Sequence, residues 1–524
     1  MKVSELYMER QNAPQLNSKV PPEKDELALV VESIERAVER RDFNQAASLM
    51  NESVAAAWFG LPPHRIIEIL EQIVRNMERP PPFIAAAYNI LTASTATLDN
   101  TKILMDSFDA DDPRQMFALA MYRIGDFRLH GYTTQAMEQV DSAEAYLKQL
   151  RTTTPSVWRL HAAVHIGTTA MLAGDFTRAL SSLMRAQMLP ASPRFAFLER
   201  EAIVKSALIH ACFGNTTTAD GLLKRTERIQ RTSSWCEIQF DAHEEFVRVL
   251  TYAGGIEEAL ERLEAINLQD IGEMWPFYIV AFHRVLEAAG YHDELDHQLE
   301  MMDALPFARI DGEGFTGSVI PLKRAMVALS VGRGAEALRF LKRADSRLTY
   351  TKLVQTAADL YVGRTQLAID QTQALRKETR GFRLMEIRRL SILATAQYVA
   401  GELDASVQTL RWAAGLPRGL NPHEILLFSP EINQLAEAKV ESWPKAPAGK
   451  AIFVPKLPEP GKALTGREIE VLELLSSGHS RAEIAEKLFI SLSTVKTQLQ
   501  SLYRKLNVSS AADAVFEGER RGVL

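Results

Sequence analysis

LAGDFTRALSSL, residues 172–183, combines a glycine, an alanine five positions later and apolar residues at helical spacing. Related stretches return at residues 251–263 (TYAGGIEEALERL), 329–341 (LSVGRGAEALRFL) and 398–410 (YVAGELDASVQTL). A glycine can end a helix or admit a close neighbour, and a small residue after the turn can seat the next helix. The stretch therefore predicts a helical hairpin that recurs along the chain.

The glycine and its partner five positions later recur at a spacing of about 40 residues. The pairs are Gly131/Ala136, Gly174/Ala179, Gly214/Ala219, Gly254/Ala259, Gly290/Leu295, Gly332/Ala337, Gly363/Ala368 and Gly401/Ser406. An earlier copy, ERRDFNQAASL at 39–49, has Arg41 where the glycine is expected. Such a period is typical of a solenoid of two-helix units. The pattern resembles a degenerate array of tetratricopeptide-type repeats, and a non-repetitive helical bundle is the alternative.

The composition is that of a globular protein with more than one unit. The chain has 524 residues, of which 46% are hydrophobic and 24% charged. Cys212 and Cys236 form no spaced motif, so the sequence supports neither a disulfide framework nor a zinc site.

The N-terminus does not show the pattern of a secretory signal, and no apolar run approaches the length of a membrane span. We therefore expect a cytoplasmic protein without a membrane-spanning segment.

A proline-rich stretch divides the chain. Residues 440–463, VESWPKAPAGKAIFVPKLPEPGKA, contain five prolines, which predict an extended linker because proline interrupts helices. The expected organisation is a flexible tail at 1–26, a helical-repeat sensor or interaction domain at 27–439, this linker, and a small domain at 464–524. The predicted fold class is all-α: an α-solenoid of tetratricopeptide-like hairpins followed by a four-helix unit.

Residues 464–524 contain signals for four short helices. Thr465 with Glu468 and Ser480 with Glu483 predict capping boxes at the starts of the first two helices. A third helix is expected to begin near Ser493, with an apolar stripe on one face. The stripe consists of Val495, Leu499, Leu502 and Leu506.

The opposite face of the third helix is polar and cationic. Its residues are Thr497, Gln500 and Arg504, flanked by Lys496 and Ser501. No acidic residue occurs between Glu486 and Asp513, although the formal net charge of the whole chain is −6. Because phosphates repel carboxylates, such a face is typical of a helix-turn-helix unit that reads the DNA major groove.

The segment LTGREIEVLELLSSGHSRAEIAEKLFISLSTVKTQLQSLYRKLNVSS, residues 464–510, resembles the DNA-binding domain of the LuxR-type transcriptional regulators. The resemblance implies that Lys496 and Gln500 read bases, whereas Arg504, Lys505 and Thr465 contact phosphates. The complete set of DNA-binding residues that it implies is Thr465, Ser493, Thr494, Lys496, Thr497, Gln500, Ser501, Arg504 and Lys505.

The same resemblance implies partners. It suggests a homodimer, formed through the last helix, on an inverted-repeat operator in double-stranded DNA, with RNA polymerase as a further partner. Two residues depart from the family pattern: Gly466 stands where proline is frequent, and Gln498 stands where histidine is frequent. We expect the first change to loosen the helix cap slightly.

Motifs for catalysis are missing from the sequence. It has no G-x-x-x-x-G-K-[ST] loop, which separates it from the ATP-dependent LuxR-type activators, and no βα pattern of a receiver domain. His161 and His165 have the spacing of a metal pair, but we favour histidines that pack or lie exposed on a repeat helix. Acids outnumber bases before residue 440, so DNA contact is expected only near the C-terminus.

We therefore predict a transcription regulator rather than an enzyme, without cofactor or metal. Its array is expected to bind an unknown small-molecule, peptide or protein effector, because solenoids form extended binding surfaces. A protein-docking scaffold with secondary DNA binding is the alternative. Within DNA binding, the promoter-reading end of a sigma factor is a rival, against which the helix expected after residue 510 argues.

Overall fold

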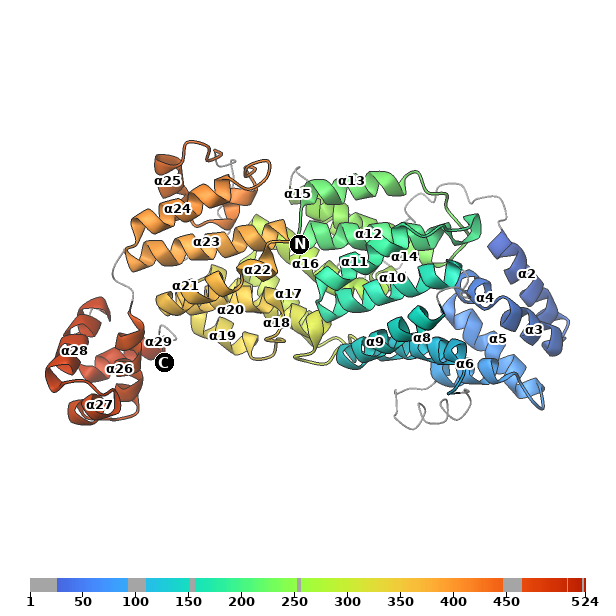
Figure 1. Ribbon diagram of the computed structural model, residues 1–524, viewed down its shortest axis with the longest axis horizontal. Helices are drawn as coiled ribbons and strands as arrows, with labels where there is room; N and C mark the ends of the chain where they lie inside the picture. The colour runs from blue at the N-terminus through green and yellow to red at the C-terminus, as the bar shows by residue number, and fades with distance from the viewer. Residues whose placement is uncertain are drawn as a thin grey trace. The chain divides into compact units, whose positions relative to one another are not determined.

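The computed structural model describes residues 26–92, 110–150, 156–251, 256–445, 464–506, 508–520 and 523–524. Within these ranges every regular element is a helix, as predicted (Figure 1). None of these helices combines the length and the apolar character that crossing a membrane requires. The predicted tail, apart from Glu26, and residues 446–463 of the predicted linker lie outside the described residues.

The chain forms two compact units. Unit 1 comprises residues 1–94, 191–199 and 229–238, and unit 2 comprises residues 95–190, 200–228 and 239–524. The helices of unit 1 are α2 (Glu26–Glu39), α3 (Phe43–Glu52), α4 (Val54–Gly60), α5 (Pro63–Asn76) and α6 (Pro82–Thr92). Later residues complete this unit: the Ser234 hydroxyl donates to the Phe59 carbonyl at 2.8 Å, and the Trp235 indole N–H donates to the Trp58 carbonyl at 3.1 Å.

Paired helices follow one another from α8 to α24 (Figure 1). The pairs are α8 (Pro113–Leu129) with α9 (Thr133–Gln149), α10 (Ser156–Ala173) with α11 (Phe176–Gln187), α12 (Ala196–Cys212) with α13 (Thr216–Thr226), α14 (Cys236–Thr251) with α15 (Ile256–Glu264), α16 (Trp275–Ala289) with α17 (His292–Asp303), α18 (Gly314–Ser330) with α19 (Gly334–Leu341), α20 (Thr349–Tyr361) with α21 (Thr365–Ala374), and α23 (Arg383–Ala400) with α24 (Leu403–Ala414). The short α22 (Arg376–Thr379) precedes α23, and α25 (Pro430–Lys439) follows α24. Short 3₁₀ helices occupy Pro193–Phe195, Leu268–Asp270, Gly272–Met274 and Glu424–Leu427.

The turns inside these pairs confirm the predicted hairpins. A positive φ, which favours glycine, occurs at Gly131, Gly174, Gly290, Gly332, Gly363 and Gly401. The partner five positions later is buried in each case: Ala136, Ala179, Leu295, Ala337, Ala368 and Ser406. Arg41 adopts a φ of 57° at the equivalent turn before α3, where the sequence lacks the glycine. The local pattern therefore fixes these turns and seats the helices that follow them. Of the two other predicted glycines, Gly214 has no positive φ, and Gly254 lies outside the described residues.

The first helices of hairpins that are remote in sequence contact one another in the array. Helix α10 packs against α18, and the Leu384 N–H at the start of α23 donates to the Phe213 carbonyl after α12 at 3.0 Å. An aromatic cluster occupies this junction, with neighbouring ring centroids 4.4 to 6.2 Å apart. Its members are Phe176, Phe213, Phe277, Phe315, Tyr350 and Phe382. Aromatic side chains from several hairpins therefore pack together at this junction.

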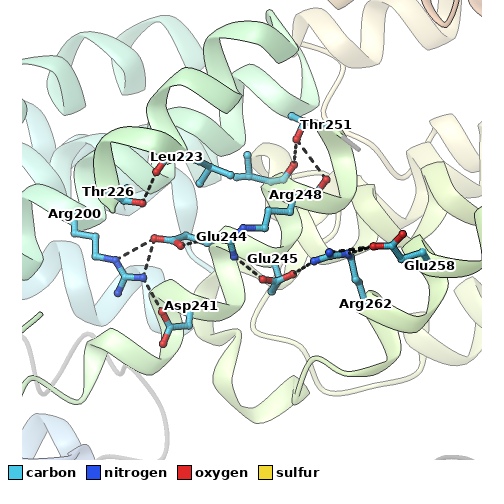
Figure 2. A network of polar contacts seen from close by, with 11 residues as sticks. Arg200, Leu223, Thr226, Asp241, Glu244, Glu245, Arg248, Thr251, Glu258 and Arg262 are labelled. Carbon is cyan, nitrogen blue, oxygen red and sulfur yellow. Dashed lines mark hydrogen bonds and ion pairs between the residues drawn. The ribbon is translucent and has the colours of Figure 1, made fainter. Parts of the chain in front are cut away.

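A chain of ion pairs connects α12, α14 and α15 (Figure 2). Arg200 on α12 pairs with Asp241 at 2.6 Å and with Glu244 at 2.8 Å, both on α14. Arg248 joins Glu244 to Glu245, which also binds Arg262 on α15 at 3.2 Å. Arg200 and Glu244 are buried, so polar contacts as well as apolar packing hold these hairpins together.

The packed array continues past its predicted end at residue 439. Val440 and Trp443 are buried in the core around α25. The Trp443 ring lies 5.0 Å from that of Phe428, and its N–H donates to the Asn433 side chain at 3.2 Å. The first residues of the predicted linker thus belong to the array, because an apolar and an aromatic side chain anchor them to it.

Candidate DNA-binding surface

The C-terminal unit has four helices and a core of its own. The helices are α26 (Gly466–Ser476), α27 (Arg481–Lys487), α28 (Leu492–Leu506) and α29 (Ala511–Arg520). Both predicted capping boxes are present, at Thr465/Glu468 and at Ser480/Glu483. The buried core contains Leu464, Ile469, Val471, Leu472, Ile484, Ala485, Val495, Leu499, Leu502, Leu506, Ala514 and Val523. The whole predicted stripe of α28 thus faces inward.

The turn between α27 and α28 begins with Phe489, which has a φ of 51° and a 95% exposed side chain. Ser491 then caps α28, since its hydroxyl accepts from the Thr494 N–H at 3.1 Å. Helix α28 therefore begins at Leu492, one residue before the position expected from the sequence. The cap explains the difference, because Ser491 supplies the side-chain oxygen that begins the first turn.

Three of the predicted DNA-contacting side chains on α28 are exposed and free. Lys496, Gln500 and Arg504 are spaced four residues apart, so they lie along one face of the helix. Within the described parts of the chain, no hydrogen bond or ion pair occupies any of these three side chains. Their donors are therefore available to a ligand outside the domain.

The predicted hydroxyl groups also serve the helix ends. Ser493 and Thr494 each lie 2.7 Å from the Ser491 hydroxyl, and the Thr497 hydroxyl donates to the Ser493 carbonyl at 3.0 Å. The exposed Thr465 hydroxyl accepts from the Glu468 N–H at 3.3 Å, so it remains able to donate its own proton. The Thr465 hydroxyl thus caps α26, the Ser493 and Thr494 hydroxyls join the cap of α28, and their contact with DNA stays a prediction.

Lys505 has a structural partner that the sequence pattern did not indicate. Its ammonium donates to the Glu468 carboxylate at 2.8 Å, and Glu468 is only 2% exposed. Burial would raise the pKa of Glu468, but hydrogen bonds from Lys505, the Thr465 backbone and the Ser501 side chain outweigh it, so the pKa lies below its ordinary value. Lys505 and Ser501 thereby hold α28 against the capped start of α26.

A further contact that sequence reasoning missed comes from Arg467. Its guanidinium donates to the Leu488 carbonyl at 2.5 Å and so ties α26 to the turn before α28. No sequence signal marks this long-range bond. A Cβ on Gly466, the departure from the family pattern, would meet nothing within 4 Å, and the capping box forms despite this glycine. Nothing in the structure assigns a role to Gln498.

Residues 462–517 match the family model described as "Bacterial regulatory proteins, luxR family". The C-terminal unit is a LuxR-family helix-turn-helix domain. The match begins just before the capped start of α26 and ends within α29, so it spans the two helices of the reader and the core behind them. The resemblance inferred from the sequence is confirmed for this domain.

Two curated relatives carry the name of transcription regulators. The "HTH-type transcriptional regulator AlkS" of Pseudomonas putida is 28% identical over 173 residues, which cover 31% of this chain and 19% of that protein. The "HTH-type transcriptional regulator MalT" of Yersinia enterocolitica is 34% identical over 103 residues, covering 19% of this chain and 11% of that protein. The chain thus aligns with less than a fifth of the length of either relative. Both alignments are longer than the LuxR-family match itself.

Among solved structures, a chain of "Crystal structure of APC/C hetero-tetramer Cut9-Hcn1" aligns with 94% of this chain and 96% of its own length. Its TM-score is 0.31 at 12% sequence identity, so the likeness supports no conclusion about this protein.

His161 and His165, which have the spacing of a metal pair, lie on α10 in the array. The two imidazole rings pack against each other with centroids 4.1 Å apart. Burial, together with the charge of Arg128, lowers the pKa of His161 to about 3, and burial lowers the pKa of His165 as well. The pair therefore consists of neutral, packed histidines, in agreement with the interpretation favoured from the sequence.

Proposed function

We propose that this chain is a DNA-binding transcription regulator whose helix α28 enters the major groove. One observation carries the proposal: Lys496, Gln500 and Arg504 are exposed and unpaired on the outer face, while the opposite face is buried. A cationic surface held rigidly from behind suits a helix that must approach phosphates and base edges. The names of the aligned relatives support the same role.

The proposed contacts divide into two kinds. Lys496 and Gln500 read base edges, and Arg504 binds backbone phosphate. The Thr465 hydroxyl adds a phosphate contact beside its capping role, and Thr494 and Thr497 face the groove with Lys496 and Gln500. Ser493 belongs to the same DNA-binding surface. Ser501 and Lys505 remain part of the proposed surface. Because both bind the Glu468 side chain, their main role in this proposal is to orient α28.

The rest of the chain is proposed to control this reader. In this scheme the array, which extends to Trp443, receives a small-molecule, peptide or protein signal in the cytoplasm, and the rest of the predicted linker, up to residue 463, transmits it. The domain at 464–524 dimerises through α29 on an inverted-repeat operator and meets RNA polymerase there. The 67% exposed Phe516 on α29 is an apolar side chain suited to such a contact.

The proposal is tested by DNA binding of the full-length protein. Genome-wide mapping of bound sites supplies the operator, and fluorescence anisotropy gives the Kd. We expect Lys496→Ala to weaken binding by roughly tenfold and to relax the preference at one base position. We expect Arg504→Ala to weaken all sequences evenly and to reduce the salt dependence by about one counterion.

Lys439→Ala, on the exposed surface of α25, is the matched control and should leave the Kd unchanged. Wild-type affinity in both Lys496→Ala and Arg504→Ala would show that the outer face of α28 is not the DNA-binding surface.

A further inference from the structure

A cluster of polar side chains on the first helices of four hairpins is not explained by the DNA-binding role. The cluster lies in the array, on α16, α18, α20 and α23, next to the aromatic junction to which Tyr350 belongs. Its members are His283, Arg284, Glu287, Lys323, Tyr350 and Arg388.

Lys323 is the centre of the cluster. The residue is 3% exposed, and its ammonium donates to the Tyr350 hydroxyl at 3.1 Å and to the Met326 sulfur at 3.8 Å. It also lies 5.3 Å from the centre of the Tyr350 ring. In the part of the chain that the structure describes, Lys323 forms no ion pair with a carboxylate. Burial of the Tyr350 hydroxyl opposes its ionisation, but the charges of Lys323, Arg388 and Arg284 lower its pKa. A buried ammonium without a counter-ion is unusual, because its desolvation is unfavourable.

His283 offers a buried donor or acceptor at the same place. The residue is 1% exposed, and its Nδ1 faces the Glu287 carboxylate at 3.6 Å. Its Nε2 is buried, and among the residues that the structure describes it has no hydrogen-bond partner. Burial, reinforced by the charges of Lys323, Arg388 and Arg284, lowers the pKa of His283 and keeps the ring neutral. A neutral imidazole with a free nitrogen can bind an oxygen of a ligand.

The cluster has an excess of positive charge. Arg284 donates to the carbonyls of Ala211 and Cys212, each at 2.9 Å, so its acceptors are neutral. Arg388 has no hydrogen bond or ion pair to any described residue. Glu287 is the one carboxylate of the cluster, and burial raises its pKa despite the three cations near it. Arg284 and Arg388 are partly exposed, whereas Lys323 and His283 are buried.

We propose that Lys323, Arg388 and Arg284, with the Nε2 of His283, bind a small organic anion through a carboxylate or phosphate group. Such a group would supply the counter-charge that Lys323 lacks, and the guanidinium of Arg388 can bind it through two parallel N–H donors. The buried positions of Lys323 and His283 suit a small molecule rather than a polymer. The binding stands by itself, whereas its effect on transcription rests on the function proposed above.

Binding is measured on the full-length protein by thermal unfolding and isothermal titration calorimetry. The probes are inorganic phosphate and citrate, each compared with chloride at equal ionic strength. We expect at least one probe to raise the unfolding midpoint above the chloride value. A response to phosphate indicates a phosphorylated ligand, and a response to citrate indicates a carboxylic acid. A midpoint that neither probe raises beyond chloride overturns the proposal.

Two variants test the location. Lys323→Met keeps the apolar stem and removes the buried charge, and we expect it to lower the affinity by roughly tenfold or more. Arg388→Gln should weaken binding without moving the midpoint measured in chloride, since Arg388 has no partner to lose, and it serves if Lys323→Met does not fold. Lys342→Gln, at an exposed position after α19, is the control and should respond like wild type. An equal anion response in Arg388→Gln and wild type contradicts the assignment.

A last measurement separates this inference from the proposed function. The Kd for operator DNA is determined with and without the anion that binds. If an anion binds through Lys323 but the Kd for operator DNA does not change, the anion site is supported. The site is then not the one through which an effector controls DNA binding. Loss of DNA binding in Lys496→Ala, together with no anion binding, supports the DNA-binding function and overturns the anion site alone.

Discussion

Arg41 shows what a repeat turn requires at the level of one residue. Its φ of 57° belongs to the left-handed region, which is unfavourable for a side chain that has a Cβ. We expect Arg41→Gly to raise the free energy of unfolding by about 0.5 to 1 kcal/mol, because relief of strain exceeds the added entropy of the unfolded glycine. Urea denaturation followed by circular dichroism gives this value.

Arg40→Gly is the matched control, since Arg40 precedes the turn without a positive φ. It should lower stability. Shifts of the same sign in both variants would show that the Arg41 backbone is not strained.

Glu468 gives the LuxR-family domain a sensitivity to acid. Its folded pKa is depressed, so its contribution is complete above the ordinary carboxyl pKa of about 4.3 and is lost as the pH falls through the folded value. We expect Glu468→Gln to destabilise the domain by about 2 kcal/mol at pH 7, and by progressively less below pH of about 4. Denaturation of the full-length protein across this pH range measures the difference.

Glu470→Gln provides the comparison, because Glu470 pairs with Arg467 at an exposed position where ion pairs contribute little. A difference between wild type and Glu468→Gln that stays constant with pH would exclude the proposed titration.

At the scale of helices, the ion pairs shown in Figure 2 make a graded prediction. Glu244→Gln removes one carboxylate partner of the buried Arg200, and we expect a loss of roughly 3 kcal/mol. Arg262→Gln, in a more exposed pair, should cost less than about 1 kcal/mol. Chemical denaturation of both variants compares the two. Equal losses of stability in the two variants would mean that the ion pairs are energetically coupled, and that the buried pair does not contribute more than the exposed one.

Helices and their ends were predictable because the signals that produce them are local. The spacing of Val495, Leu499 and Leu502 gives the buried face of α28, and the capping boxes give the starts of α26 and α27. The pairing of Lys505 with Glu468 was not predictable, since 37 positions separate the two residues and a lysine on a reader helix suggests phosphate. The same limit hid the contact between α10 and α18, which depends on how far each hairpin rotates against the next.

At the scale of the whole molecule, the proposed control by the array predicts that removing it alters DNA binding. A fragment that begins after Trp443 lacks the whole array, including the core around α25, and retains the LuxR-family domain with its own core. We expect its operator Kd or its dimerisation constant to differ from that of the full-length protein by at least about fivefold, a typical coupling between sites. Anisotropy and analytical ultracentrifugation measure the two constants.

In this comparison, the operator Kd of full-length Lys496→Ala shows how large the change is when the reader helix itself is impaired. Identical constants for the fragment and the full-length protein would favour the alternative interpretation, in which the array is a docking scaffold and DNA binding is independent of it.

The hydrogen bond between Leu384 and Phe213 has a consequence for how the protein is made. Repeat arrays commonly fold by adding one unit to its neighbour, but here Phe176 has ring partners at Phe315 and Phe382, far later in the chain. Contacts between such distant residues slow folding, because a long loop must close before they form. During synthesis, the apolar side of the early hairpins therefore stays incompletely covered until residue 384 has left the ribosome, and we expect nascent chains of intermediate length to be the most prone to aggregation.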